Sequence, residues 1–136
     1  MVKSKFAIST HILTFLAKYD EDWVTSGKLA SSININPVLV RKELSILKDH
    51  GLIESREGKH GGVKLAKPAK HILLSEIFIL AKGDDHILGF SKNDGNPNCD
   101  VGRNIKNNLT SLYTEIDTLI ELRLSKMTLA EFTNLF

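Results

Sequence analysis

Hydrophobic residues recur at helical spacing over the first fifty residues of the chain. Residues 4–19 carry a broad apolar face, and shorter apolar patterns of the same period cover residues 26–33 and 37–50. In the third pattern, Val40, Leu44 and Leu47 fall at intervals of four and three and should face a core. These spacings predict three helices, the second and third separated only by a short turn at residues 34–36.

The third predicted helix has the clearest boundaries in the chain. Asn36 suits the N-cap, and Pro37 suits the first helical position, where no amide donor is needed. His50 and Gly51 follow the last apolar position, and glycine favours the left-handed conformation that often ends a helix. The second helix can be capped by Thr25 or Ser26. Residues 25–50 therefore predict a helix-turn-helix.

Two short strand-like runs follow the helix-turn-helix directly. Residues 52–56 and 63–66 are separated by a connection with three glycines and the side chains of Lys59 and His60. A charged hairpin behind a helix-turn-helix is the layout of a winged helix. The predicted fold class is mostly α with a small β-hairpin.

The second half of the chain predicts one long helix behind a loop. Ser75 can cap a short helix over residues 76–81, and residues 83–98 are rich in Gly, Asn and Asp, which is typical of a loop.

The long helix spans residues 100–125, about 39 Å at the usual rise. Its apolar positions form a coiled-coil-like seam, predicted to join two copies of the chain: Ile105, Leu109, Leu112, Ile116 and Leu119. The alternative is that this seam packs on its own domain. Thr128 and Glu131 form a capping box for a final helix ending at Phe136.

Charge divides the chain at about the same place as the hydrophobic pattern. Residues 1–70 hold 12 Lys and Arg against 7 Asp and Glu, whereas residues 71–136 hold 6 against 9. We therefore expect a DNA-binding winged domain over residues 1–70, and a dimerisation helix with its preceding loop, a possible sensor region, over residues 71–136.

A winged helix-turn-helix binds double-stranded DNA by placing its second helix in the major groove and its hairpin on the backbone. Exposed side chains early in that helix should reach base edges, with arginine the usual reader of guanine. The predicted DNA-binding residues are Ser26, Asn36, Val38, Arg41, Lys42, Arg56, Lys59, His60 and Lys64. Arg41 taken alone can equally contact a phosphate or form a surface ion pair.

Three segments together resemble one family of bacterial transcription factors. They are INPVLVRKELSILKD, HGLIESREGKHGGVKLAKP and the loop ending NPNCDVGRNI. The chain is similar, over nearly its whole length, to the winged-helix regulators that include IscR, NsrR and CymR. The resemblance implies a homodimer joined through the long helix and bound to a palindromic operator. It also implies that the loop before that helix can be a sensor of iron–sulfur, nitric oxide or redox status.

The loop departs from the cluster-binding members of that family, which use three cysteines where this chain has only Cys99. Iron–sulfur clusters normally take four protein ligands, and neither His86 nor Asp94 has a spacing that argues for a ligand. We therefore expect no cofactor and place the chain in the cluster-free branch. Cys99 is then either a redox-sensing thiol, activated at the start of the long helix, or a small residue packed there.

Other functional classes find little support. The five histidines show no metal-ligand spacing, and no P-loop, nucleophile elbow or paired-carboxylate motif indicates an enzyme. With no apolar run of membrane length, no visible secretory signal and one cysteine, we expect a cytoplasmic protein that does not enter a membrane. The sequence predicts a dimeric, sequence-specific regulator, a repressor in the simplest mechanism, with an unknown effector. The alternatives are a thiol-responsive regulator acting through Cys99, and a winged protein-interaction module without DNA binding.

Overall fold

A computed structural model describes residues 2–136, with side chains from Ser4 onward. Most of the chain is helical, and the only sheet in these residues is an antiparallel pair in which Ile53 faces Leu65 and Arg56 faces Gly62. The elements are α1 (Val2–Lys18), α2 (Ser26–Ile33), α3 (Pro37–Asp49), β1 (Ile53–Arg56), β2 (Gly62–Leu65), η1 (Ala69–His71), α4 (Leu74–Lys82), α5 (Asp100–Leu124) and α6 (Leu129–Thr133). The predicted fold class is confirmed.

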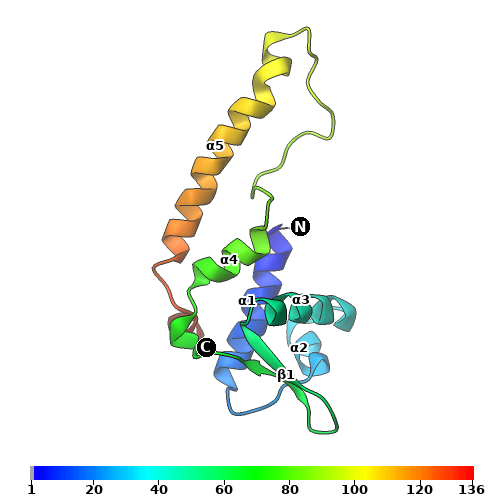
Figure 1. Ribbon diagram of the computed structural model, residues 1–136, viewed down its shortest axis with the longest axis vertical. Coiled ribbons are helices and arrows are strands. Elements are labelled where there is room, and N and C mark those ends of the chain that lie inside the picture. The colour runs from blue at the N-terminus through cyan, green and yellow to red at the C-terminus, as the bar shows by residue number, and fades with distance from the viewer. Residues whose placement is uncertain (1) are drawn as a thin grey trace.

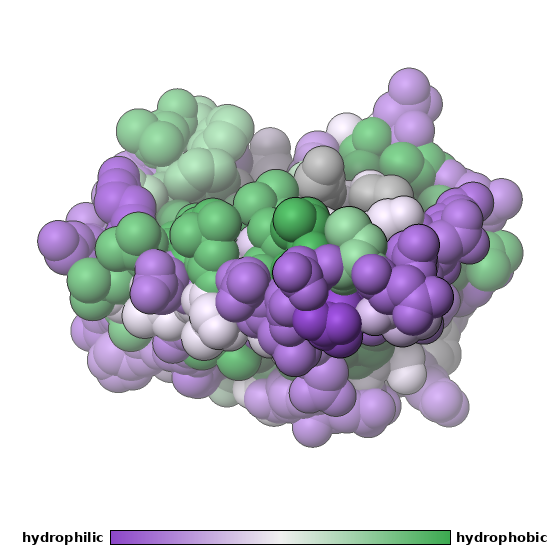
Figure 2. Space-filling view, turned by 90° about the horizontal axis from the view of Figure 1, so that it is seen from above, coloured by the Kyte–Doolittle hydropathy of each residue, from purple (hydrophilic) through white to green (hydrophobic). Residues whose placement is uncertain are grey.

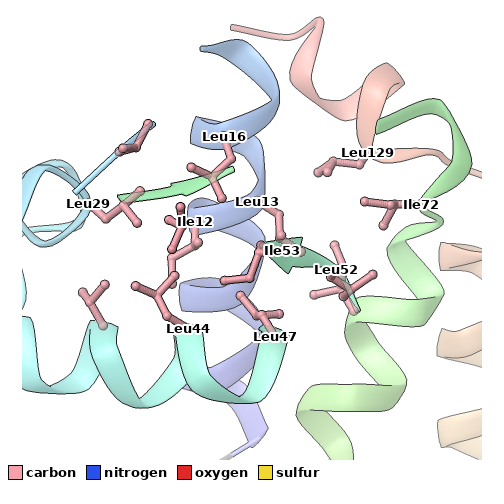
Figure 3. Packing of buried hydrophobic residues seen from close by; sticks show 14 of the residues in the cluster. Ile12, Leu13, Leu16, Leu29, Leu44, Leu47, Leu52, Ile53, Ile72 and Leu129 are labelled. Carbon is pink, nitrogen blue, oxygen red and sulfur yellow. The ribbon is translucent and has the colours of Figure 1, made fainter. Parts of the chain in front are cut away.

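Helix α1 is the centre of the hydrophobic core. Its residues Ile12, Leu13 and Leu16 are almost completely buried and point toward side chains from α2, α3 and β1 (Figure 3). Leu29 of α2 and Leu47 of α3 are buried in the same cluster. Burial of apolar surface is the main favourable term in folding. The helix-turn-helix and the hairpin are therefore held in place by packing on α1.

The core continues across the predicted domain boundary at residue 70. Helices α4 and α6 both pack on α1, and Ile72 and Leu129 are completely buried in the common cluster. The backbone of Leu129 donates to Ile72 O at 2.7 Å, and that of Leu74 donates to Met127 O at 3.0 Å. Residues 72–81 and 127–133 therefore share one core with the winged domain.

Most of helix α5 and residues 83–99 lie outside that core, although α5 contacts α4 and its Leu124 packs against the core. α5 rises obliquely away from the winged body, and the loop runs up beside it to join its first turn (Figure 1). Viewed along the long axis, patches of hydrophobic surface lie open between hydrophilic ones (Figure 2). No helix within residues 2–136 is both long and apolar enough to cross a membrane.

Two predicted boundaries differ from the structure. Ser75 is not a helix cap, because α4 begins at Leu74 and buries Ser75 in its first turn; there the Glu76 side chain accepts from the Leu73 amide. The last helix ends at Thr133 rather than Phe136, although the predicted capping box is present, with Glu131 N donating to Thr128 Oγ1 at 3.0 Å. The short 3-10 helix η1 was not predicted, and the other elements begin and end within two residues of their predicted positions.

Candidate nucleic-acid interface

Helices α2 and α3 have the N-caps that the sequence predicts. Thr25 Oγ1 accepts from the amide of Lys28, and Asn36 Oδ1 accepts from the amide of Val38 at 2.9 Å. Asn34 ends α2 in the left-handed conformation, with φ of 63°. Because these bonds satisfy amides that a helix start leaves free, they fix where α2 and α3 begin and which side chains the first turns of α3 expose.

The outer face of α3 carries four of the predicted DNA-binding side chains. Asn36, Val38, Arg41 and Lys42 are all exposed, in the first two turns of the helix or at its cap. Leu39 is also exposed, at 49 %. Apolar side chains at such positions can contact the thymine methyl group, so Leu39 is a further candidate that the sequence reading missed.

The inner face of α3 contains one charged residue, Glu43. Its side chain is buried, and Ser9 Oγ of α1 donates to its Oε2 at 3.2 Å. A buried carboxylate needs hydrogen bonds to offset the cost of leaving water. The Ser9–Glu43 bond therefore links α3, the candidate recognition helix, to α1 and fixes the rotation of α3 about its own axis.

The hairpin is held by a third extended segment, which pairs with β2. Val24 donates to Val63 O at 3.0 Å, and Val63 donates back to Val24 O at 2.8 Å. Gly62 makes this close approach possible, since a Cβ there would lie 2.5 Å from Val24 O. The strand pair is therefore fixed close to its turn, while Lys59 and His60 are exposed at the tip.

Trp23 organises the basic side chains of the hairpin. The Arg56 guanidinium carbon lies 4.6 Å from its ring centroid, and Lys64 Nζ lies 5.3 Å away, both at cation–π distance. Arg56 also donates to the carbonyl oxygen of His60. Trp23 thus brings Arg56 and Lys64 to one face of the hairpin. The sequence analysis missed this role because α2 and α3 separate Trp23 from the hairpin along the chain.

Ser26 lies apart from this cluster, half-buried in the first turn of α2. The structure thus brings Arg56 and Lys64 together on Trp23, leaves Lys59 and His60 at the hairpin tip, and exposes the α3 residues on the outside of that helix. All nine DNA contacts stay predictions.

The loop before α5 is anchored to that helix by a buried carboxylate. Asp117 Oδ2 lies 2.6 Å from His86 Nδ1, and Asp117 Oδ1 accepts from the amide of Ile87 at 3.2 Å. Tyr113 Oη donates to Gly89 O at 2.8 Å, and the ring of Phe90 packs on Tyr113. The first half of the loop is therefore fixed along one face of α5.

Cys99 is the N-cap residue of α5 and is exposed. The nearby backbone amides of Gly102 and Val101 lower the pKa of the thiol below its ordinary value of 9.0. The turn around it is tight, since a Cβ on Gly95 would lie 1.9 Å from Gly102 O. Cys99 therefore has the access and the electrostatic setting of a reactive thiol.

The predicted seam of α5 lies next to the face that the loop covers. Ile105, Leu112 and Leu119 are 43 %, 48 % and 66 % exposed, while Leu109 and Ile116 between them are half-buried. All three side chains keep a large part of their surface open to solvent in the described chain. An exposed apolar row along a long helix is typical of a surface that meets a partner.

Comparison with known proteins assigns the family. The model of the Rrf2 family, described as an iron-dependent transcriptional regulator, matches residues 2–134. The chain belongs to the Rrf2 family. It is 30 % identical over 134 residues to the Bacillus subtilis (strain 168) protein named "Putative HTH-type transcriptional regulator YwnA", with 98 % of each chain covered. These findings confirm the predicted regulator family: the chain is a DNA-binding transcriptional regulator, not an enzyme.

Solved structures share the fold over nearly the whole chain. A structure described as a "putative transcriptional regulator" from Lactobacillus plantarum has a TM-score of 0.76 and 29 % identity, covering 96 % of this chain and 87 % of that one. The B. subtilis global cysteine regulator CymR has a TM-score of 0.71 with 97 % and 95 % covered, and at 19 % identity it supports the fold alone.

The Rrf2 family is described as iron-dependent, but the side chains of this member do not form a recognisable iron site in the described residues. Cys99 is the single cysteine. Within residues 2–136, no three His, Cys, Asp or Glu side chains gather closely enough to hold a metal ion. His86, one of the two conceivable auxiliary ligands, is paired with Asp117 instead. The donor set expected for an iron–sulfur cluster is therefore not supplied by this chain.

Proposed function

We propose that this Rrf2 member is a homodimeric repressor that binds a palindromic operator without an iron–sulfur cluster. The observation that carries the proposal is the exposed apolar seam of α5, which stands clear of the winged body. Pairing two such helices would bury Ile105, Leu112 and Leu119 from both copies. A two-fold dimer presents two α3 helices to the DNA, and this matches the symmetry of a palindromic site.

In this dimer α3 enters the major groove and the hairpin contacts the adjacent backbone. Arg41 is the side chain proposed to read a base, because it is exposed in the first turns of α3 and carries a bidentate donor group. Lys59 at the hairpin tip is proposed to contact a DNA phosphate. A phosphate contact depends on positive charge and needs less exact geometry than a contact to a base edge. Repression follows if the occupied operator overlaps a promoter.

Gel-shift titrations against DNA upstream of the protein's own gene, and against other genomic fragments, test this function. Arg41→Ala should relax the preference at one base pair per half-site by about 1–3 kcal/mol. Lys126→Ala, in the turn between α5 and α6, is the matched control and should bind like wild type. The proposal fails if no fragment binds specifically, or if both variants behave identically.

A thiol-responsive regulator is the second candidate, favoured by the lowered pKa of the exposed Cys99 thiol. The loop that ends at Cys99 packs along α5, so oxidation there would act next to the proposed dimer seam. Diamide or peroxide should then change DNA affinity in wild type but not in Cys99→Ser, which should bind normally when untreated. An identical oxidant response in both proteins excludes this role.

A further inference from the structure

The hairpin and the segment before α2 form an antiparallel ribbon of three extended segments. Val24 pairs with Val63, and both side chains are buried. One residue along in the same register, Trp23 lies across from Lys64. Because side chains alternate between the two faces of extended backbone, Trp23 and Lys64 lie on the outer face of the ribbon. Arg56 is exposed on that same face of β1, since its partner in the register is Gly62.

Gly62 gives the Arg56 side chain room to cross the ribbon. A glycine at this position leaves no side chain above β2, so the guanidinium carbon of Arg56 reaches within 4.6 Å of the Trp23 ring centroid. Lys64 Nζ lies 5.3 Å from the same centroid. A second contact holds Arg56, because its guanidinium donates to the carbonyl oxygen of His60 across the turn. Two cations are thus held at one aromatic ring.

Both cations stay available to an external anion. Glu54 faces Lys64 in the strand register, and Glu57 follows Arg56 in the sequence. The ion pairs among the side chains described, from Ser4 onward, nevertheless include none in the hairpin. Stacking on a ring uses the flat face of a guanidinium, so the N–H groups at its edge can still donate to a phosphate.

We propose that Trp23 is a positioning residue for DNA binding, which holds Arg56 and Lys64 as a preformed pair of cations for the DNA backbone. The inference rests on the proposed function and adds a residue that need not contact DNA itself. A long side chain loses rotamer freedom when it is fixed at an interface, and this loss weakens binding. The Trp23 ring orders both side chains before DNA arrives, so less freedom remains to be lost. Sequence preference is unaffected, because phosphate contacts do not read bases.

NMR spectroscopy of the full-length protein without DNA tests the stacking itself. The ring current of Trp23 should move side-chain resonances of Arg56 and Lys64 upfield, and Trp23→Leu should return them to ordinary positions. Lys59, exposed at the hairpin tip, is the internal control and should show no such shift. Unshifted Arg56 and Lys64 resonances in wild type would overturn the proposal, whatever the protein does with DNA.

Fluorescence anisotropy with a short duplex of random sequence, over a series of salt concentrations, tests the consequence for binding. Trp23→Leu should lower affinity about 10-fold, because two side chains must then be ordered on binding. The slope of log affinity against log salt should stay that of wild type, since the same phosphates are contacted. Arg56→Gln and Lys64→Gln should instead each reduce that slope by about 1.

A double-mutant comparison separates positioning from a direct or purely structural role. In a protein that already carries Arg56→Gln and Lys64→Gln, Trp23→Leu should have no further effect. Trp23→Tyr should recover most of the affinity, because a tyrosine ring also attracts cations. Tyr19→Leu, which removes another exposed ring just after α1, is the matched control and should bind like wild type. Trp23→Val, with a residue suited to extended backbone, replaces Trp23→Leu if that variant does not fold.

Unchanged affinity in Trp23→Leu would overturn the proposal, and so would a reduced salt slope in that variant. An equal loss in the doubly substituted background, or no recovery in Trp23→Tyr, would show that the indole acts on DNA in another way and would overturn it too. Absence of binding to the random duplex even at low salt would overturn the backbone role of the pair. Failure to find a palindromic operator would count against the proposed function alone, because neither arm uses one.

Discussion

The exposed seam of α5 allows a quantitative prediction for Leu112→Ala. Leu112 lies midway along the seam and is 48 % exposed in the single chain. Full burial of a leucine side chain is worth about 1.5–3 kcal/mol, so completing its burial in a dimer is worth about 1 kcal/mol per copy. Both copies lose this term, so Leu112→Ala should weaken the dimer by about 2 kcal/mol, or about 30-fold in its dissociation constant.

Sedimentation equilibrium over a wide concentration range measures that constant directly. Thr114→Ala is the control, because Thr114 is exposed on the same helix but points away from the seam by helical spacing. Its side chain donates only to Thr110 O within α5, so its removal should leave association unchanged. Equal dissociation constants for Leu112→Ala and wild type would refute the assignment of the seam, as would equal weakening by Thr114→Ala.

Four further predictions follow from individual contacts. Thr14→Val should raise the free energy of unfolding in urea by about 1 kcal/mol, because it removes a buried hydroxyl without a partner; lower stability would contradict that. The rate of alkylation at Cys99 should rise with pH around a midpoint below that of the urea-unfolded chain, because backbone amides lower the pKa of the folded thiol; coincident profiles would contradict that effect of the amides. Asp117→Ala should release the loop at His86 and Ile87, seen as faster proteolysis of residues 84–92, and an unchanged cleavage rate would show that other contacts hold the loop. Lys59→Ala should lower DNA affinity equally for all sequences and reduce the slope of log affinity against log salt by about 1; an unchanged slope would remove Lys59 from the phosphate contacts.

Local signals in the sequence were enough to predict most of the fold. Asn36 and Pro37 specify the start of α3 through one side-chain bond and one fixed dihedral angle, and both depend only on neighbouring residues. The same is true of the capping box at Thr128. Ser75 failed as a cap because the start of α4 is set by a tertiary contact, in which the Leu74 amide donates to Met127 O from the far end of the chain.

The candidate site was predictable only in part, for a related reason. Exposed residues on α3 follow from helical spacing around Val40, Leu44 and Leu47. By contrast, the stacking of Arg56 and Lys64 on Trp23, and the pairing of His86 with Asp117, join residues far apart in sequence. Such contacts leave no periodic signal. The contact of Lys18 with Phe136 O likewise needs the last helix folded back onto the first.

Selection of bound genomic fragments by the purified protein, followed by footprinting, shows whether a dimer reads DNA through α3. We expect an enriched palindrome whose two half-sites lie about 10 base pairs apart, or a multiple of that, since two α3 helices must reach major grooves on one side of the duplex. Leu112→Ala should need a higher protein concentration to protect the same site. Absence of an enriched sequence, or protection of a single half-site by one chain, would contradict a dimer that reads DNA through α3.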